Sequence, residues 1–371
     1  MGLPHVAANG DSMRRRDVLA GAGVVAGAAF SFPKPAVSQG LRQLTMVTDW
    51  PEGPGLIPSA RRLAQAVTDA TAGRIRIEVF AAGGLVRPLE AFDAVQAGVA
   101  EMYISNAGYY DTKSPAFHFY SGVPFGLTAN ELFAWMRFGG GQALWDALSA
   151  PFNIKPLSCC STGTQMGGWF NHEIASVESF KGLRYRMAGP GAEVLRQLGA
   201  TMVMLPGTEI TSSLKSGAID ACEWIGPWLD TEMGLHKIAP YYYYPAWHEP
   251  GTAQMLGINT KIWESLTPAD QRLIEAAAAQ EYTVSLAEFQ ANNATALRAL
   301  RNDGAVKIRK FDDTMLKTFY EMSQDVLAKI GSGDELSKKV YASYMDFRRL
   351  ISGWTDISEG SFLALRSAVT A

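Results

Sequence analysis

A pattern that occurs twice constrains the fold of this chain more than any other feature. Val95–Glu101 resembles Leu214–Asp220, and each copy reads as a helix end, a glycine and a short apolar strand behind an acidic residue. Both copies follow an apolar strand and a glycine-containing loop. Strand–helix–strand order at this spacing predicts an α/β sheet with its ligand at the carboxyl ends of the strands. The repeat therefore predicts two similar α/β lobes, and chance similarity over so short a stretch is the alternative.

Hydrophobic periodicity predicts the other elements. Apolar residues alternate with period two in segments that we expect to be strands, at 43–47, 72–80 and 241–244. Helical spacing predicts helices from residue 54 onward and over 88–96, 268–300 and much of 312–371. Thr267 is a good N-cap and Pro268 suits a first helical turn. The four tyrosines at 241–244 are expected to alternate between buried and edge positions.

The N-terminus predicts export. Arg14–Arg16 precede an apolar run, Leu19–Phe30, and a small-residue cleavage site follows at Ala36–Ser38. This order is typical of a twin-arginine (Tat-type) signal peptide, which we expect to span residues 1–38. A membrane anchor is the alternative, but the run is short for a bilayer and rich in alanine and glycine. The sequence therefore predicts a periplasmic protein.

The charge balance excludes a nucleic-acid partner. The chain has 33 Lys and Arg against 36 Asp and Glu, a net charge of −3. Within 1–38, three Arg and one Lys face two Asp, a net of +2, so removal of this segment takes the chain to −5. A mildly acidic protein has no electrostatic footprint for nucleic acid.

Three cysteines are present, Cys159, Cys160 and Cys222. An odd number at these spacings is neither a disulfide framework nor a zinc site. We expect them to be buried, small apolar side chains at strand positions. One bridge from Cys222 to Cys159 or Cys160 is the alternative.

The segment from Ser158 to Trp224 contains the residues best suited to bind a carboxylate or a cation. Gln165 lies between glycines, where a backbone can approach a ligand closely. Arg184 and Arg186 share a face of one strand, so periodicity alone does not decide which reaches a ligand. An arginine can bind a carboxylate through two N–H groups. Glu223, with an amide and a carbonyl oxygen beside it, suits a hard cation such as Na⁺ or Ca²⁺.

At these spacings, residues from about 44 to about 300 resemble the solute-binding proteins of tripartite ATP-independent periplasmic (TRAP) transporters. The resemblance is to the branch that binds 2-oxo or 2-hydroxy monocarboxylates through a metal ion. It implies an α/β fold of the two-lobed periplasmic binding protein class (type II-like), with the ligand cleft between the lobes and long C-terminal helices. It also implies a transport receptor that docks on membrane permease subunits and is not an enzyme.

The resemblance gives a domain division. Lobe I is expected to comprise 39–160 plus 255–311, and lobe II to comprise 161–254. The C-terminal helical extension, 312–371, is associated in this branch with dimers that exchange a helix. A helix folded on its own subunit is the alternative.

The resemblance also implies roles for individual residues. Arg186 clamps the substrate carboxylate, while Gln165, Glu223 and the carbonyl of Trp224 bind the metal, and the Trp224 indole forms a wall. Tyr109, preferred to Tyr110 by its position, and Glu249 are further candidates to line the cleft. The family often carries an asparagine shortly before this glutamine, and Ser161 and Thr162 occupy that stretch here. The choice of carboxylate, and of Na⁺ or Ca²⁺, stays open.

The sequence gives less support to other functions. It has no GxSxG elbow, P-loop or GxGxxG after a strand, and its histidines are scattered, so an enzyme has no support. A periplasmic sensor partner that binds a carboxylate would share the fold and the cleft. A receptor for another organic acid, without a metal, is a further alternative.

Overall fold

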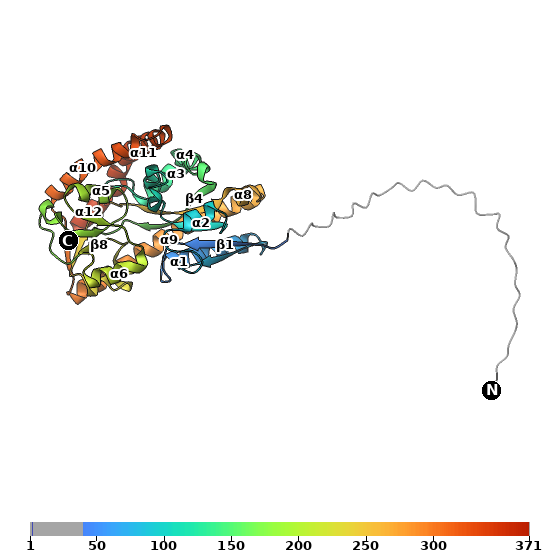
Figure 1. The fold of residues 1–371 in the computed structure, drawn as a ribbon, viewed down its shortest axis with the longest axis horizontal. Helices are drawn as coiled ribbons and strands as arrows, with labels where there is room; N and C mark the ends of the chain where they lie inside the picture. Colours follow the sequence, from blue (N-terminus) through green and yellow to red (C-terminus); the bar gives the residue numbers. More distant parts are fainter. Residues whose placement is uncertain (1, 3–39, 371) are drawn as a thin grey trace. The chain divides into compact units, whose positions relative to one another are not determined.

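Two mixed β-sheets, each the centre of one lobe, organise the chain (Figure 1). This computed structural model describes residues 2 and 40–370. Apart from Gly2, the signal peptide predicted for 1–38 lies outside the described residues.

Lobe I contains a five-stranded sheet with the order β2 (Ile75–Phe80), β1 (Arg42–Thr48), β3 (Met102–Ser105), β10 (Thr252–Asn259) and β4 (Ile154–Gly163). The first three strands are parallel, and β10 runs antiparallel to both of its neighbours. Its helices are α1 (Leu56–Ala70), α2 (Ala91–Gln96), α3 (Ala129–Phe138), α4 (Gly141–Ser149) and α8 (Thr260–Glu264). The strand predicted from residue 72 begins at Ile75, because Ala72 and Gly73 form a turn with φ of 50° and 78°.

Lobe II contains a six-stranded sheet with the order β11 (Lys307–Lys310), β9 (Tyr241–Tyr244), β5 (Gly168–Phe170), β8 (Ala221–Cys222), β6 (Arg184–Arg186) and β7 (Thr201–Val203). Its helices are α5 (Pro190–Gln197), α6 (Gly207–Ser216) and α7 (Pro227–Glu232). The predicted alternation of the β9 tyrosines is wrong, since Tyr242 and Tyr243 are both buried. Both faces of β9 are covered: Tyr242 stacks on Trp169 and Tyr243 on Phe311.

The repeat seen in the sequence is confirmed as a repeat of structure. In the first copy α2 is followed by Gly98 with φ 77°, and β3 starts four residues later. In the second copy α6 is followed by Gly217 with φ 73°, and β8 starts four residues later. Glycine suits both positions because it adopts positive φ without steric cost. The ends of β3 and β8 therefore occupy equivalent places in the two lobes.

Three segments connect the sheets. Residues 164–167 join β4 to β5, residues 245–251 join β9 to β10, and α9 (Pro268–Asp303) leads from lobe I back to β11. The predicted start of α9 is confirmed, with the Thr267 hydroxyl accepting from the Asp270 N–H at 3.1 Å. Because α9 contacts β4 and α1 in lobe I and α7 in lobe II, it returns the chain to the second sheet. The predicted assignment of 255–311 to lobe I is therefore wrong for β11, which pairs with β9.

The C-terminal extension is helical, as predicted, with α10 (Asp313–Gly331), α11 (Glu335–Thr355) and α12 (Ser361–Thr370). Helix α10 packs on α5 of lobe II, and α11 packs on α4 of lobe I. Figure 1 shows α10 and α11 along one side of the lobes. None of the helices within 40–370 is long and apolar enough to cross a membrane.

All three cysteines are buried and free, on β4 and β8. Their predicted burial at strand positions is confirmed, and the bridge from Cys222 that the sequence left open is not formed.

Candidate functional site

The residues singled out in the sequence converge on one small cavity. Its volume is about 20 Å³. It is lined by Trp50, Asn106, Tyr109, Gln165, Arg186, Ala188, Glu223, Trp224, Ile225, Glu249 and Gln254. A cavity of this size holds about one water molecule. A carboxylate ligand therefore requires the lobes or the lining side chains to move apart.

Arg186 is the arginine of β6 that lines this cavity. It is 1% exposed. An arginine is rarely buried to this extent unless its guanidinium has a partner. Arg184, two residues earlier, lies at the surface, where it binds Asp220 through Nε and Nη2 at 2.9 and 2.6 Å. The two arginines that periodicity could not separate therefore differ in surroundings, and only Arg186 faces the cleft.

Arg186 forms a buried ion pair with Glu223. Its Nη1 donates to the Glu223 carboxylate at 2.5 Å and to the Glu223 backbone carbonyl at 3.0 Å. Its Nε donates to the Leu205 carbonyl at 3.1 Å, and its guanidinium carbon lies 5.3 Å from the centre of the Trp224 ring. These contacts fix the guanidinium on the lobe II wall of the cavity.

Glu223 keeps its charge in this environment. Burial acts to raise the pKa of the carboxyl, but the Arg186 charge, His248 and the Ala188 N–H outweigh it, so the pKa is lowered. Oε1 accepts from Arg186 and from the Ala188 N–H at 3.2 Å. Oε2 lies 3.8 Å from Nε2 of His248, beyond hydrogen-bond distance. One oxygen of this carboxylate is therefore still able to bind a cation.

Gln165 has an unsatisfied oxygen in the same cavity. Its Nε2 donates to the Thr252 hydroxyl at 3.1 Å, and that hydroxyl donates to Glu249 at 3.0 Å. This chain of hydrogen bonds fixes the orientation of the amide. Oε1 of Gln165 is buried and has no hydrogen-bond partner. A buried polar atom without a partner costs about 1–3 kcal/mol, and a cation would remove that cost.

Glu249 is protonated at neutral pH. Burial, with the nearby Glu223 charge, raises the pKa of its carboxyl to about 8, against the lowering effects of Thr252 and Arg186. A protonated carboxyl can donate a hydrogen bond to a ligand oxygen. Gln165 and Glu249 stand on two of the segments that connect the lobes, and the Gln165 N–H donates to the Glu249 carbonyl at 3.3 Å.

Tyr109, not Tyr110, lines the cavity. Tyr110 instead donates to Asp49 at 2.6 Å within lobe I. Burial, with smaller effects from Glu223 and Glu249, raises the pKa of Tyr109 to about 12, while Arg186 acts to lower it. Its phenol is therefore a neutral donor that lobe I presents to the Arg186 side of the site.

Trp50, Asn106 and Gln254 also line the cavity and were missed in the sequence. Asn106 directly follows β3 and Trp50 lies two residues after the end of β1, so the rule that ligands bind at the carboxyl ends of strands could have found both. Gln254 lies inside β10 and carries no such signal.

The oxygens available fit a hard cation. They are Oε1 of Gln165 and one carboxylate oxygen of Glu223, and Na⁺ and Ca²⁺ prefer such ligands. Within residues 40–370 there is no cluster of three or more His, Cys, Asp or Glu side chains suited to a metal. These two residues provide one charged and one neutral oxygen, which leaves coordination positions for the Trp224 carbonyl expected from the sequence and for a chelating ligand.

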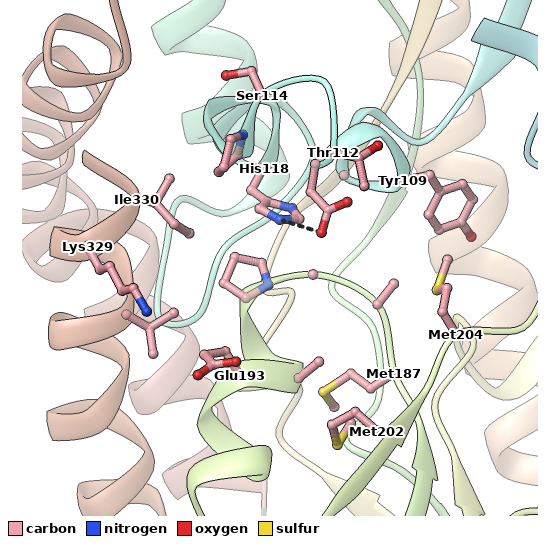
Figure 2. Close-up of a pocket in the computed structure, with 18 of the residues that line it drawn as sticks. Tyr109, Thr112, Ser114, His118, Met187, Glu193, Met202, Met204, Lys329 and Ile330 are labelled. Atoms are coloured by element: carbon pink, nitrogen blue, oxygen red, sulfur yellow. Dashed lines mark ion pairs between the residues drawn. The ribbon is translucent and has the colours of Figure 1, made fainter. Parts of the chain in front are cut away.

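A larger cavity of about 740 Å³ lies beside the small one, and Tyr109 and Ala188 line both. Figure 2 shows Tyr109 and His118 on its lobe I side, and Met187, Met202 and Met204 on its lobe II side. The dashed line in Figure 2 joins His118 to Asp111 at 3.9 Å. The two cavities therefore adjoin at Tyr109 and Ala188.

Comparison with known proteins identifies the family. Residues 46–334 match the model of the bacterial extracellular solute-binding proteins, family 7. The chain belongs to this family. Its members are solute-binding proteins of transport systems and not an enzyme class.

This solute-binding protein is similar to a monocarboxylate 2-oxoacid-binding periplasmic protein of a Nostoc species, with 39% identity over 317 residues. The alignment covers 85% of this chain and 87% of the relative.

Two solved TRAP solute-binding proteins have the same fold. One is from Bordetella bronchiseptica, a dimer with copurified calcium and picolinate; it has a TM-score of 0.87 and 34% identity, with 89% of this chain and 98% of that chain covered. The other is from Pseudoalteromonas atlantica, with bound sodium and pyruvate; it has a TM-score of 0.84 and 32% identity, with 87% and 99% covered. The predicted two-lobed binding-protein fold is thereby confirmed.

Proposed function

We propose that this protein is the extracytoplasmic receptor of a TRAP transporter and binds a small 2-oxo or 2-hydroxy monocarboxylate through Arg186 and a bound Na⁺ or Ca²⁺. The observation that carries the proposal is the buried, unsatisfied oxygen of Gln165 in the same cavity as the Arg186–Glu223 ion pair. The names of the relatives, which include a 2-oxoacid-binding protein and structures with pyruvate, support the same ligand class.

The ion pair gives the binding mechanism. Arg186 and Glu223 satisfy each other while the cavity is small. A cation beside Glu223 and Gln165 takes over the neutralisation of Glu223, and N–H groups of Arg186 then become available for a ligand carboxylate. The oxo or hydroxyl oxygen of the ligand completes the coordination of the cation. Cation and ligand therefore bind cooperatively, since each provides contacts that the other lacks.

The charges agree with a monocarboxylate. Arg186 and Glu223 cancel, and protonated Glu249 adds no charge. One ligand carboxylate is then balanced by one Na⁺, whereas Ca²⁺ leaves one positive charge that an ionised Glu249 would cancel. A dicarboxylate would need a second buried cationic side chain, and Arg184 is paired with Asp220 at the surface.

Closure of the lobes follows from the placement of these groups. Tyr109 comes from lobe I, while Arg186, Glu223 and Trp224 come from lobe II. A ligand held between them favours the closed form by its differential affinity for that form. The closed receptor would dock on the membrane permease subunits of the transporter in the periplasm, after export through the twin-arginine signal. A sensor partner with the same cleft is the second candidate.

The function is tested by calorimetry with a panel of acids. We expect pyruvate and other small 2-oxo or 2-hydroxy monocarboxylates to bind in buffer with Na⁺ or Ca²⁺. Binding should weaken strongly after dialysis against chelator in Na⁺-free buffer. Acetate, which has a carboxylate but no second oxygen for chelation, is the matched control and should bind weakly in both buffers. Equal binding of pyruvate with and without these cations would refute the metal bridge.

We also propose a homodimer formed through the C-terminal helices. Helix α12 packs mainly on the turn before it, and the exposed apolar side chains near the C-terminus include Trp354, Ile357, Phe362, Leu365 and Val369. Several large apolar side chains exposed on one short segment favour an interaction site there. The similar Bordetella protein is a dimer.

The dimer is tested by placing one charge on each of two faces of α12. Leu365→Asp should shift the mass measured by light scattering from dimer toward monomer, because it buries a charge in the apolar contact. Ser367→Asp adds the same charge to an exposed polar position two residues away and should leave the mass unchanged. A monomeric wild-type protein at micromolar concentration would overturn the proposal.

A further inference from the structure

Asp230 is a buried carboxyl that the ligand cavity does not use. It lies on α7 and is 1% exposed. Its Oδ1 accepts from the backbone N–H groups of Ile225 and Gly226 at 3.1 and 3.0 Å. Its Oδ2 accepts from Nε1 of Trp169 at 2.9 Å and from the hydroxyl of Tyr242 at 2.7 Å.

These hydrogen-bond donors determine whether the Asp230 carboxylate can bind an ion itself. Four hydrogen bonds satisfy both oxygens, so the carboxylate has no lone pair left to bind an ion directly. Burial raises the pKa of Asp230 to about 6, with the four donors acting against that rise, so the group is ionised at neutral pH. Trp169 and Tyr242 stack with ring centres 3.8 Å apart and hold the carboxylate on the sheet of lobe II. A fixed negative charge therefore stands behind the Ile225 N–H.

That N–H belongs to the same peptide unit as the carbonyl of Trp224. A trans peptide is planar, and its N–H and C=O point in opposite directions. The cis peptide found among the described residues is Tyr244–Pro245, so the Trp224–Ile225 bond is trans. Since Asp230 holds the N–H on one side, the Trp224 carbonyl oxygen is directed to the other side.

Backbone hydrogen bonds of the neighbouring peptides link the segments that carry the other candidate metal ligands. The Ile225 carbonyl accepts from the Met166 N–H at 3.1 Å, which ties the segment after Trp224 to the residue after Gln165. The Glu223 N–H donates to the Arg186 carbonyl at 3.1 Å. The two segments that present the amide, carboxylate and carbonyl oxygens are thus linked to each other, and Asp230 anchors one of them.

We propose that Asp230 is a positioning residue for the bound cation, and that it orients and polarises the Trp224–Ile225 peptide so that the Trp224 carbonyl oxygen faces the ion. The inference rests on the proposed metal-assisted function. A carboxylate behind the N–H draws the peptide dipole toward it and increases the negative charge on the carbonyl oxygen. Groups that orient and polarise metal ligands in this way typically contribute about 10–100-fold to metal affinity.

The first test is calorimetry with Ca²⁺ alone and with Na⁺ alone. Asp230→Asn keeps the size of the side chain and removes its charge, and we expect it to weaken cation affinity by about 10–100-fold. Tyr242→Phe is the matched control: it removes a hydrogen bond to the other oxygen of the same carboxylate and leaves the Ile225 contact in place. A purely structural role predicts that both variants bind the cation equally, and that result would overturn the proposal.

A second test observes the peptide itself. Ile follows Trp at one place in the sequence, Trp224–Ile225, so protein made with carbonyl-¹³C Trp and ¹⁵N Ile gives a single carbonyl–amide NMR correlation. In the wild-type protein we expect Ca²⁺ to shift both the Trp224 carbonyl carbon and the Ile225 amide. This measurement decides the question even if Asp230→Asn does not fold, because a correlation that stays in place on Ca²⁺ binding contradicts the proposal.

The outcomes separate this inference from the function on which it rests. If the wild-type protein binds neither cation, the metal-assisted function fails and the role of Asp230 fails with it. If the wild-type protein binds Ca²⁺ and Asp230→Asn binds it within twofold, the function stands and the positioning role is wrong.

Discussion

Replacement of Arg186 by alanine is expected to reduce the affinity for 2-oxo acids by roughly 30-fold or more. Truncating one partner of a buried, hydrogen-bonded charge pair costs about 2–5 kcal/mol, and every 1.4 kcal/mol is a factor of ten. Arg186 is fully buried and faces the cavity, so its charge acts on a ligand carboxylate with little screening by solvent. Calorimetry with pyruvate at a saturating concentration of the cation measures the loss.

Arg184→Ala is the control for this experiment. It removes the same side chain from the same strand, but from a position that is exposed and paired with Asp220. Its affinity for pyruvate should match that of the wild type. Arg186→Lys keeps the charge but loses the planar, two-point contact, and it should lie between the alanine variant and the wild type. If Arg186→Ala binds pyruvate as tightly as Arg184→Ala, Arg186 does not hold the carboxylate.

Folding must be measured alongside binding. Removal of Arg186 leaves Glu223 as a buried charge without its guanidinium, and such losses destabilise proteins by about 3–5 kcal/mol. A cation beside Glu223 would restore part of that stability. Arg186→Ala should therefore gain more thermal stability from added Ca²⁺ than the wild-type protein does, while its gain from pyruvate falls.

The sequence was sufficient to predict what local patterns determine. The repeat around Gly98 and Gly217 specified two equivalent strand ends, because a glycine with positive φ ends each helix and places the next strand. The N-cap at Thr267 predicted the start of α9 for the same kind of local reason. Such features depend on a few neighbouring residues, and one sequence displays them.

Features that depend on distant segments were not predictable in this way. The sequence-based division wrongly assigned β11 to lobe I. The pairing of β11 with β9 depends on where α9 ends in space, which no local pattern specifies. Gln254 enters the cavity from the middle of a strand, which no spacing rule identifies. The Arg186–Glu223 ion pair joins β6 to the segment after β8, and the sequence allowed Glu223 to pair with an arginine but did not specify which one.

Burial decided between alternatives that periodicity left open. Arg184 and Arg186 occupy alternate positions of one strand, but the first is half exposed and the second is buried. Tyr109 and Tyr110 are adjacent, and the hydroxyl of Tyr110 donates to Asp49 in the interior of lobe I. In both cases a tertiary partner, Asp220 or Asp49, removes one candidate from the cleft.

The second large effect is expected at Glu223. Glu223→Gln keeps the size of the side chain and an oxygen for the Ala188 N–H, but it removes the negative charge that would bind the cation. Residues that only orient the metal ligands contribute about 10–100-fold to cation affinity. Loss of the charged ligand itself should cost at least as much. Because cation and ligand bind cooperatively, pyruvate affinity in the presence of Ca²⁺ should fall by a similar factor. Calorimetry with Ca²⁺ measures the first loss, and calorimetry with pyruvate in the presence of Ca²⁺ measures the second.

Glu249→Gln provides the comparison, since it makes the same chemical change in the same cavity. Glu249 has a pKa of about 8, so at pH 6.5 its carboxyl is already neutral and the amide removes no charge. At that pH the loss of Ca²⁺ affinity in Glu249→Gln should be much smaller than in Glu223→Gln. At pH 9 the wild-type Glu249 is ionised, so Glu249→Gln then removes a charge and its deficit should grow. Equal losses for the two variants at pH 6.5 would mean that Glu223 is not the charged ligand, and that the cation is held by the cavity as a whole.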